Sequence, residues 1–109
     1  MPKGPWKRPA DDGEAMVFAL KHPLRRRLLV AYAEGVCSPT QVAQRQREDL
    51  HLVAYHSRAL SFFGVIELVE TRPSRGSTQH FYTANDLGRR ALELAESSGM
   101  IDGDEAQPG

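Results

Sequence analysis

The sequence has 109 residues, of which 40% are hydrophobic, 26% charged and 7% aromatic. This length suits a single domain, and the composition is typical of a water-soluble globular protein rather than of a disordered or fibrous chain. No stretch approaches the roughly 18 consecutive apolar residues of a membrane-spanning helix. Fourteen Lys and Arg balance fourteen Asp and Glu, so the net charge alone gives no argument for nucleic acid as a partner.

The cysteine content and the N-terminal residues indicate the cellular compartment in which the protein works. Cys37 is the only cysteine, so the chain can form no internal disulfide and no zinc site built from several thiolates. The N-terminal sequence has basic residues and prolines, but no apolar run follows them, which argues against a secretory signal. We therefore expect a cytoplasmic protein.

The two ends of the chain differ in composition from the middle. Residues 1–13 are rich in proline, glycine and charge without periodicity, and residues 98–109 are acidic and rich in small residues. Segments of this kind rarely bury enough apolar surface to fold. We expect a flexible N-terminal tail over residues 1–13, one domain over residues 14–97 and a flexible acidic C-terminal tail over residues 98–109.

The first half of the domain predicts two helices separated by a proline. Residues 14–21 form a short apolar-rich stretch that cannot continue through Pro23, which restricts the residue before it. Pro23 suits the first turn of a second helix, which Gly35 can end. The three consecutive arginines at positions 25–27 span about 200° around this helix, so at most one or two can face the same phosphate track and we expect the rest to be solvated.

Two further helices are predicted across a tight turn. The sequence Ser38-Pro39-Thr40-Gln41 has the pattern of a capping box with proline at the first helical position, and it begins a short helix that ends near residue 47. Asp49 can cap a longer helix over residues 50–63, which Gly64 ends. Small or apolar residues recur at helical spacing on the inward faces of both: Val42, Ala43, Val53, His56 or Ser57, Leu60 and Phe63.

The pattern then changes to strands. Residues 65–72 are rich in β-branched side chains, residues 73–77 are typical of a turn, and residues 79–83 predict a returning strand. Asn85 or Asp86 can cap a last helix that runs to about residue 96. The predicted fold class is mainly α with a small β-hairpin: a winged helix-turn-helix of four helices, a two-stranded wing and a C-terminal helix.

Four separated segments carry a resemblance to a known family. They are HPLR at 22–25, YHSRAL at 55–60, FGVI at 63–66 and RGSTQHFY at 75–82. In this order and spacing they resemble the bacterial ArsR-type winged-helix transcriptional regulators over about residues 15–96. The resemblance implies a homodimer that is joined through its first and last helices, binds an inverted-repeat operator in double-stranded DNA and usually represses transcription.

The same resemblance indicates which residues would contact DNA. In the recognition helix, histidine, tyrosine and arginine can donate to base edges or phosphates, whereas leucine and alanine can pack on thymine methyl groups. In the wing, a glycine allows a tight tip and the arginines can reach a phosphate or the minor groove, although a solvated loop also carries such arginines. The predicted DNA-binding residues are His51, Leu52, Ala54, Tyr55 and Arg58 in the helix, and Arg72, Arg75 and Gly76 in the wing.

The first and last helices offer more apolar surface than one thin core layer should need. A second copy of the chain could cover it, since DNA half-sites one turn apart require two-fold symmetry. Alternatively, these side chains complete the core of the monomer. The predicted interface residues are Met16, Phe18, Ala19, Leu20, Leu87, Ala91, Leu92 and Leu94.

Several positions depart from the pattern of metal-sensing family members. The recognition helix has no cysteine motif and the four histidines fall on different predicted elements, so we expect no metal and no cofactor. We expect His56 to be a partly buried structural histidine with its hydrogen bonds satisfied. Ser57 stands where the family usually has leucine, and Cys37 is either a redox switch or an inert half-buried residue.

Two other functional classes are alternatives to a DNA-binding regulator. Neutral net charge and a weakly basic recognition helix would also suit a winged-helix module that binds proteins and has lost specific DNA binding. No phosphate loop, carboxylate pair or nucleophile with a base indicates an enzyme. Residues 15–60 nevertheless carry seven basic residues against three acidic ones, so the neutrality is an average over opposed segments, and the nature of any effector stays open.

Overall fold

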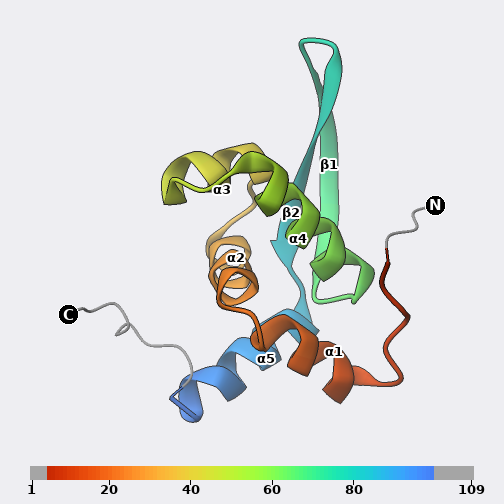
Figure 1. Ribbon diagram of the computed structural model, residues 1–109, viewed down its shortest axis with the longest axis vertical. Coiled ribbons are helices and arrows are strands. Elements are labelled where there is room, and N and C mark those ends of the chain that lie inside the picture. Colours follow the sequence, from red (N-terminus) through yellow and green to blue (C-terminus); the bar gives the residue numbers. More distant parts are fainter. Residues whose placement is uncertain (1–4, 100–109) are drawn as a thin grey trace.

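Five helices and one antiparallel hairpin make up the computed structural model, which describes residues 5–99 (Figure 1). This is the predicted fold class, with four helices, a two-stranded wing and a C-terminal helix. No helix within residues 5–99 combines the length and apolar character needed to cross a bilayer. The elements in chain order are α1 (Asp12–Leu20), α2 (Pro23–Glu34), α3 (Pro39–Gln46), α4 (Leu50–Phe62), β1 (Ile66–Ser74), β2 (Ser77–Ala84) and α5 (Asp86–Ser97).

Each helix begins at a side chain that accepts a hydrogen bond from the first turn. The predicted capping box is present at α3, where the Gln41 amide donates to Ser38 Oγ at 3.2 Å and the Ser38 amide donates to Gln41 Oε1 at 3.0 Å. Asp49 and Asn85 cap α4 and α5 as predicted. His22 is an unpredicted cap, since its Nδ1 accepts from the Leu24 amide at 3.1 Å. These bonds satisfy amide groups that have no partner within their helix.

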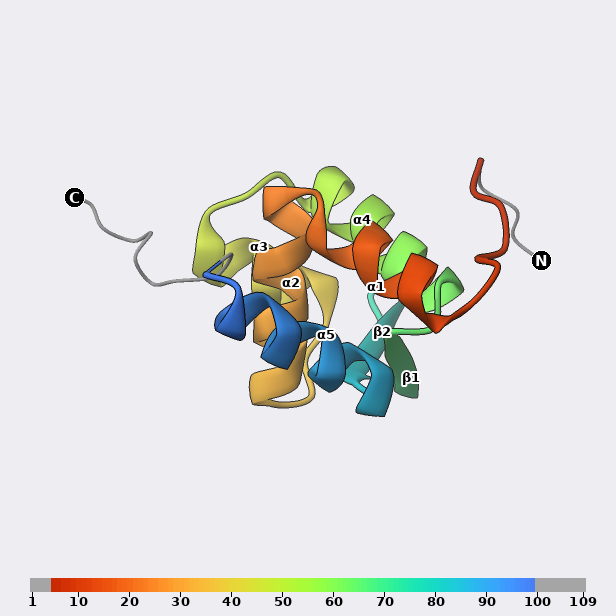
Figure 2. The same cartoon turned by 90° about the horizontal axis from the view of Figure 1, so that it is seen from below.

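Helix α2 lies at the centre of the fold, and three of its side chains, Leu28, Leu29 and Tyr32, are fully buried. Helices α1 and α5 pack side by side below it, as the view from below shows (Figure 2). Helix α4 and strand β2 of the hairpin pack on its other sides, and α3 packs on α4 and β2. The arrangement therefore separates a base formed by α1 and α5 from an upper part that carries α3, α4 and the wing (Figure 1).

The hairpin is longer and its turn tighter than the sequence predicted. Arg75 and Gly76 alone form the loop, with φ of 47° and 82°, and the strands pair from Ile66 with Ala84 up to Ser74 with Ser77. Two successive residues with positive φ are typical of the two-residue turns that match the twist of paired strands. Proline is tolerated near the end of β1 because each strand of a two-stranded sheet has one edge without a partner.

The start of α5 is joined closely to the chain before β1. Asn85 Nδ2 donates to the Gly64 carbonyl at 2.7 Å, and Asn85 Oδ1 accepts from the Gly88 amide at 2.9 Å. A Cβ atom at Gly88 would lie 2.2 Å from the Val65 carbonyl oxygen. Glycine at this position therefore lets the backbone of α5 approach the strand that begins the wing.

We expect Gly88→Ala to lower the free energy of unfolding by about 1–3 kcal/mol, because the backbone oxygen at Val65 cannot move without shifting α5. Helix propensity alone predicts the opposite sign, a gain of about 1 kcal/mol. Gly13→Ala is the matched control: its nearest atom is an Asp11 side-chain oxygen at 3.4 Å, so this variant should be as stable as the parent or more stable. Urea denaturation followed by circular dichroism measures both, and a Gly88→Ala protein as stable as Gly13→Ala would contradict the steric argument.

Candidate nucleic-acid interface

Helices α3 and α4 meet across a three-residue turn. Arg47 ends α3 in a left-handed conformation with φ of 57°, and its amide donates to the Ala43 carbonyl. Asp49 then starts α4 by accepting from the His51 amide at 2.8 Å. Val42, Ala43 and Val53 are buried where the helices cross, as predicted, because small side chains let two helices approach closely. The pair forms a helix-turn-helix with one face of α4 free.

The outer face of α4 carries the five predicted readout residues. His51, Leu52, Tyr55 and Arg58 are exposed and Ala54 is partly exposed, whereas Val53, His56, Ser57 and Leu60 are buried. Leu52 exposes 45% of its surface and the neighbouring Leu50 44%. The outer face of α4 thus combines polar side chains with large apolar ones that are open to solvent.

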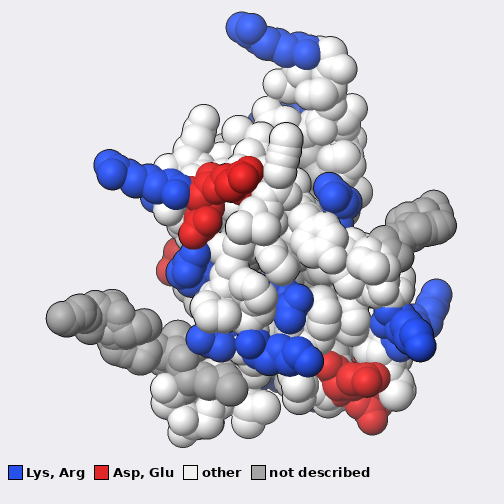
Figure 3. Space-filling view, viewed as in Figure 1, with Lys and Arg blue, Asp and Glu red and all other residues white. Residues whose placement is uncertain are grey.

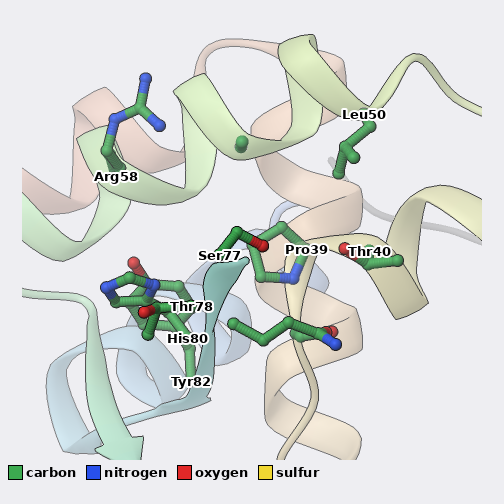
Figure 4. Close-up of a pocket in the computed structure, with 11 residues that line it drawn as sticks. Pro39, Thr40, Leu50, Arg58, Ser77, Thr78, His80 and Tyr82 are labelled. Atoms are coloured by element: carbon green, nitrogen blue, oxygen red, sulfur yellow. The ribbon is translucent and has the colours of Figure 1, made fainter. Parts of the chain in front are cut away.

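A groove of about 350 Å³ separates α4 from β2 and the start of α3 (Figure 4). Arg58 and Leu50 lie on its α4 side, and Thr78 and His80 lie on its β2 side. Burial raises the pKa of Tyr82, which also lines the groove, and the positive charge of Arg58 opposes that rise. The sequence analysis did not select the polar groove residues Thr40, Thr78, Gln79 and His80, although Thr78, His80 and Tyr82 alternate along β2 and so share a face.

The predicted wing residues lie in two different settings. Arg72 is held within the hairpin: its Nε donates to Glu70 Oε2 at 2.9 Å and its guanidinium lies 4.4 Å from the centre of the Phe81 ring. Arg75 is at the tip, where it makes no ion pair with any described residue. Gly76 has the positive φ that was predicted for it. The space-filling view accordingly shows basic side chains at the far end of the wing (Figure 3).

The three consecutive arginines of α2 lie in different environments: Arg27 is exposed, as expected for part of the run, whereas Arg25 is buried, which the sequence did not predict. Arg25 is buried, with its guanidinium 3.8 Å from the centre of the Phe18 ring. Arg26 donates to the Leu20 carbonyl at 2.6 Å, at the C-terminal end of α1. A guanidinium can stack on an aromatic ring and bind helix-end carbonyls, and both interactions take it out of solvent.

Arg27 forms an ion pair across to the turn between α3 and α4. Its Nη2 lies 2.6 Å from Glu48 Oε2, and its Nε donates to Gln46 Oε1 at 3.4 Å. A carboxylate at Glu48 would repel phosphate near this turn, as that of Asp49 does. Because Arg27 compensates it, the repulsion expected there is reduced to that of Asp49.

Comparisons with known proteins find solved structures with a similar fold. No family model and no curated protein matches the sequence. Among solved structures, the fold is similar to an ArsR family transcriptional regulator, with TM-score 0.59 and 21% identity over 83% of this chain and 96% of that one. It is also similar to a protein described as a "Possible transcriptional regulator for arsenical resistance", with TM-score 0.56 and 20% identity over 84% of this chain and 91% of that one. The chain has the ArsR-type winged-helix fold.

Within this fold, the residues predicted for a dimer interface divide into three groups. Ala19, Leu20 and Ala91 are buried in the core of the single chain, which is the alternative that the sequence analysis left open. Leu94 exposes 53% of its surface, and Val17, which was not selected, exposes 60%. The remaining predicted residues are partly buried against the core: Met16, Phe18, Leu87 and Leu92.

Ser57, the departure from the family pattern on α4, forms a buried hydrogen bond. Its Oγ lies 2.8 Å from the hydroxyl oxygen of Tyr32 on α2, and both side chains are fully buried. Burial raises the pKa of Tyr32 well above its ordinary value, so this hydroxyl stays neutral. The serine therefore accommodates a tyrosine hydroxyl from the facing helix instead of filling the space with a larger apolar side chain.

Two histidines that are far apart in the sequence meet beneath α4. The rings of His22 and His56 have centroids 4.7 Å apart, and buried Arg25 lies near both. Burial lowers the pKa of His56, and the charges of His22 and Arg25 lower it further. His56 is inward-facing as predicted, but its Nδ1 has no hydrogen-bond partner among the described residues, so the expectation of satisfied hydrogen bonds is wrong. The described residues contain no cluster of three or more metal-binding side chains.

Cys37 lies in the loop between α2 and α3 and is almost fully buried. Its backbone forms an isolated bridge to Tyr82 of β2, with bonds of 3.1 and 2.9 Å. Burial raises the pKa of its thiol, which lowers the fraction of reactive thiolate. These features favour the structural alternative over the redox switch.

The bond between Tyr32 and Ser57 can be tested by a double-mutant cycle. Tyr32→Phe or Ser57→Ala alone should lower the free energy of unfolding by about 1–3 kcal/mol, because each leaves a buried hydroxyl without a partner. The double variant should lose less than the sum of the two, as measured by chemical denaturation. Ser61→Ala, at a partly exposed position of α4, is the control and should change stability by less than about 0.5 kcal/mol. Additive single effects would contradict the direct bond.

The lowered pKa of His56 predicts that the folded protein loses stability in mild acid. The unfolded chain takes up a proton as the pH falls through about 6.5, whereas the folded chain resists protonation at His56, so stability is full above about pH 6.5 and declines below it. We expect the melting temperature to fall between about pH 7.5 and about pH 5.5, and His56→Gln to flatten that dependence. His51→Gln removes an exposed histidine and should keep it. Equal pH dependence in the parent and in His56→Gln would contradict this role.

Proposed function

We propose that this protein is a sequence-specific DNA-binding transcriptional regulator, acting as a homodimeric repressor on an inverted-repeat operator. The observation that carries the proposal is the free outer face of α4, bordered by a groove and by a hairpin with an unpaired arginine at its tip. A helix of about 10–12 Å diameter matches the width of the DNA major groove. The solved structures that share the fold include an ArsR family transcriptional regulator.

In this proposal α4 enters the major groove with its exposed face toward the bases. His51, Tyr55 and Arg58 donate hydrogen bonds to base edges, and Leu52 and Ala54 contact thymine methyl groups. Arg75, at the tip of the wing, binds phosphate or enters the adjacent minor groove. Arg72 lends the wing positive charge but is oriented by Glu70 and Phe81, so we assign it a smaller share of the affinity.

The base formed by α1 and α5 is the surface we propose for the second copy of the chain. Its exposed and partly exposed apolar side chains are Met16, Val17, Phe18, Leu87, Leu92 and Leu94. A two-fold axis through this base would present two copies of α4 to successive half-sites of an inverted repeat. Repression is the simplest outcome, because a bound dimer covers the promoter DNA beneath it.

Selection of bound duplexes from a random DNA pool tests the proposal and yields the operator. We expect enrichment of an inverted repeat and a steep loss of affinity with salt, because phosphate contacts release counterions. A folded protein that enriches no sequence and binds duplex DNA with a flat salt dependence would overturn the proposal. That result would favour the winged-helix protein-interaction module instead.

Three substitutions separate phosphate contacts from base contacts. Arg75→Ala should weaken binding to all duplexes similarly and lower the magnitude of the salt slope by about 1, whereas Tyr55→Ala or Arg58→Ala should change the preferred sequence at a cost of about 1–3 kcal/mol. Arg90→Ala, at an exposed position of α5, is the control and should alter neither. Fluorescence anisotropy on selected and random duplexes measures both quantities. The assignment fails if all three variants lose the same affinity for both kinds of DNA.

The dimer surface can be tested at its most exposed predicted residue. Leu94→Lys should weaken self-association by about tenfold or more, or roughly 1.4 kcal/mol, because it would bury a charge in an apolar contact. Val36→Lys changes an equally exposed apolar residue in the loop between α2 and α3 and should leave the dimer intact. Sedimentation velocity over a range of concentrations measures the effect, and a Leu94→Lys protein that dimerises like the parent would place the interface elsewhere.

A further inference from the structure

The segment before α1 is attached to α4 through an aromatic cluster. Trp6 lies with its ring centroid 5.4 Å from that of Tyr55 and 5.7 Å from that of Phe62. These two residues are seven positions apart on α4, so they share one face of the helix. Ala59 lies between them on that face and is fully buried. Trp6 is itself partly buried against the core, although the sequence analysis placed it within a flexible tail.

The other end of the segment is fixed at the start of α1. The Ala10 amide donates to the Glu14 carboxylate, and the Glu14 amide donates to Asp11 Oδ1 at 2.9 Å. Lys7 and Arg8 lie between these two attachments, and both are exposed. Neither forms an ion pair with any residue of the described chain. Both line a hollow with residues of α1 and with Phe63 at the end of α4. Two cations without an ion pair are thus held beside α1 and the C-terminal end of α4, on a backbone that is tethered on both sides.

Trp6 and the groove beside the wing meet different sides of the exposed face of α4. Ala54 and Tyr55 are adjacent in sequence and so lie about 100° apart around the helix axis. Ala54 faces the groove beside β2, whereas Tyr55 contacts Trp6. The view from below shows the N-terminal segment beside the start of α1 and the C-terminal end of α4 (Figure 2). The exposed face of α4 is therefore bordered by the groove and wing on one side and by Trp6 on the other.

We infer that residues 5–10 form a second DNA-contacting arm, in which docked Trp6 holds Lys7 and Arg8 against the phosphate backbone. The inference rests on the proposed function. A helix in the major groove has a phosphate backbone on each side of it, so a basic element on the side away from the wing meets the second strand. Proline at positions 5 and 9 restricts the arm, which lowers the entropy lost when it binds.

The test compares removal of the arm's charge with removal of its anchor. Lys7→Gln/Arg8→Gln should lower the magnitude of the salt slope by about 2, since each phosphate contact contributes about 0.9. Trp6→Ala keeps both charges but should lower the magnitude of the salt slope by a similar amount. Adding Lys7→Gln and Arg8→Gln to Trp6→Ala should then lower the slope little further. Arg90→Gln removes a cation from α5 and should leave the slope unchanged. Binding is measured on the selected duplex and on one of mixed sequence, with thermal melting to confirm that each variant is folded.

Trp6 is the only tryptophan in the chain, so its fluorescence reports the position of the arm directly. DNA binding should shield Trp6 further from a neutral collisional quencher if the arm stays docked in the complex. Tighter DNA binding by Trp6→Ala would overturn the inference, because it would mean that the arm competes with DNA for Tyr55. Unchanged slopes in the arm variants would overturn the inference alone, whereas a parent protein that binds no duplex would overturn the proposed function as well.

Discussion

The placement of α4 relative to the wing depends on one buried side chain, Tyr32. Its hydroxyl bonds to Ser57 of α4 at 2.8 Å, its ring meets that of Tyr82 of β2 edge-on at 5.6 Å, and its carbonyl accepts from Thr83 Oγ1 at 3.3 Å. A single residue of α2 thus contacts both walls of the groove. Since hydrogen bonds inside a protein are directional and expensive to leave unmade, these contacts fix the distance between the helix and the hairpin more tightly than apolar packing alone would.

The distribution of the arginines explains how a chain with no net charge can present a basic face. Arg25, Arg26 and Arg27 are held by an aromatic ring, a helix end and a carboxylate within the fold. Arg75 and Arg58 instead remain exposed at the tip of the wing and beside the groove. The number of arginines in α2 therefore overstates the positive charge that this helix presents to a ligand. The wing and α4 have fewer arginines but leave them exposed. The affinity for phosphate depends on this second set, whose fields act within a Debye length of about 8–10 Å.

Local signals in the sequence were sufficient for the helices and for the face of α4. The capping box at Ser38, the cap at Asp49 and the buried positions of α4 all depend on residues within a few positions of each other. Contacts between distant segments were not predictable in this way. The hydrogen bond between Tyr32 and Ser57 and the aromatic contact between Trp6 and Tyr55 join residues 25 or more positions apart, and no sequence spacing predicts either of them. The polar residues of β2 that line the groove are an intermediate case. Alternation along the strand predicts that Thr78 and His80 share a face, but not that this face lies opposite α4.

Phe18 shows how the base of the molecule and α4 are connected. The sequence analysis placed it at the dimer interface, yet its ring stacks on Phe63 at 3.7 Å with an interplanar angle of 3°, while Arg25 lies 3.8 Å from its centre. Phe63 caps the C-terminal end of α4. One aromatic ring therefore joins α1, α2 and α4, and because packed interiors transmit displacement rather than absorb it, a shift of α1 at a dimer interface would reach the end of α4. The residues around Phe18 thus give a physical route by which dimer geometry and the orientation of α4 are coupled.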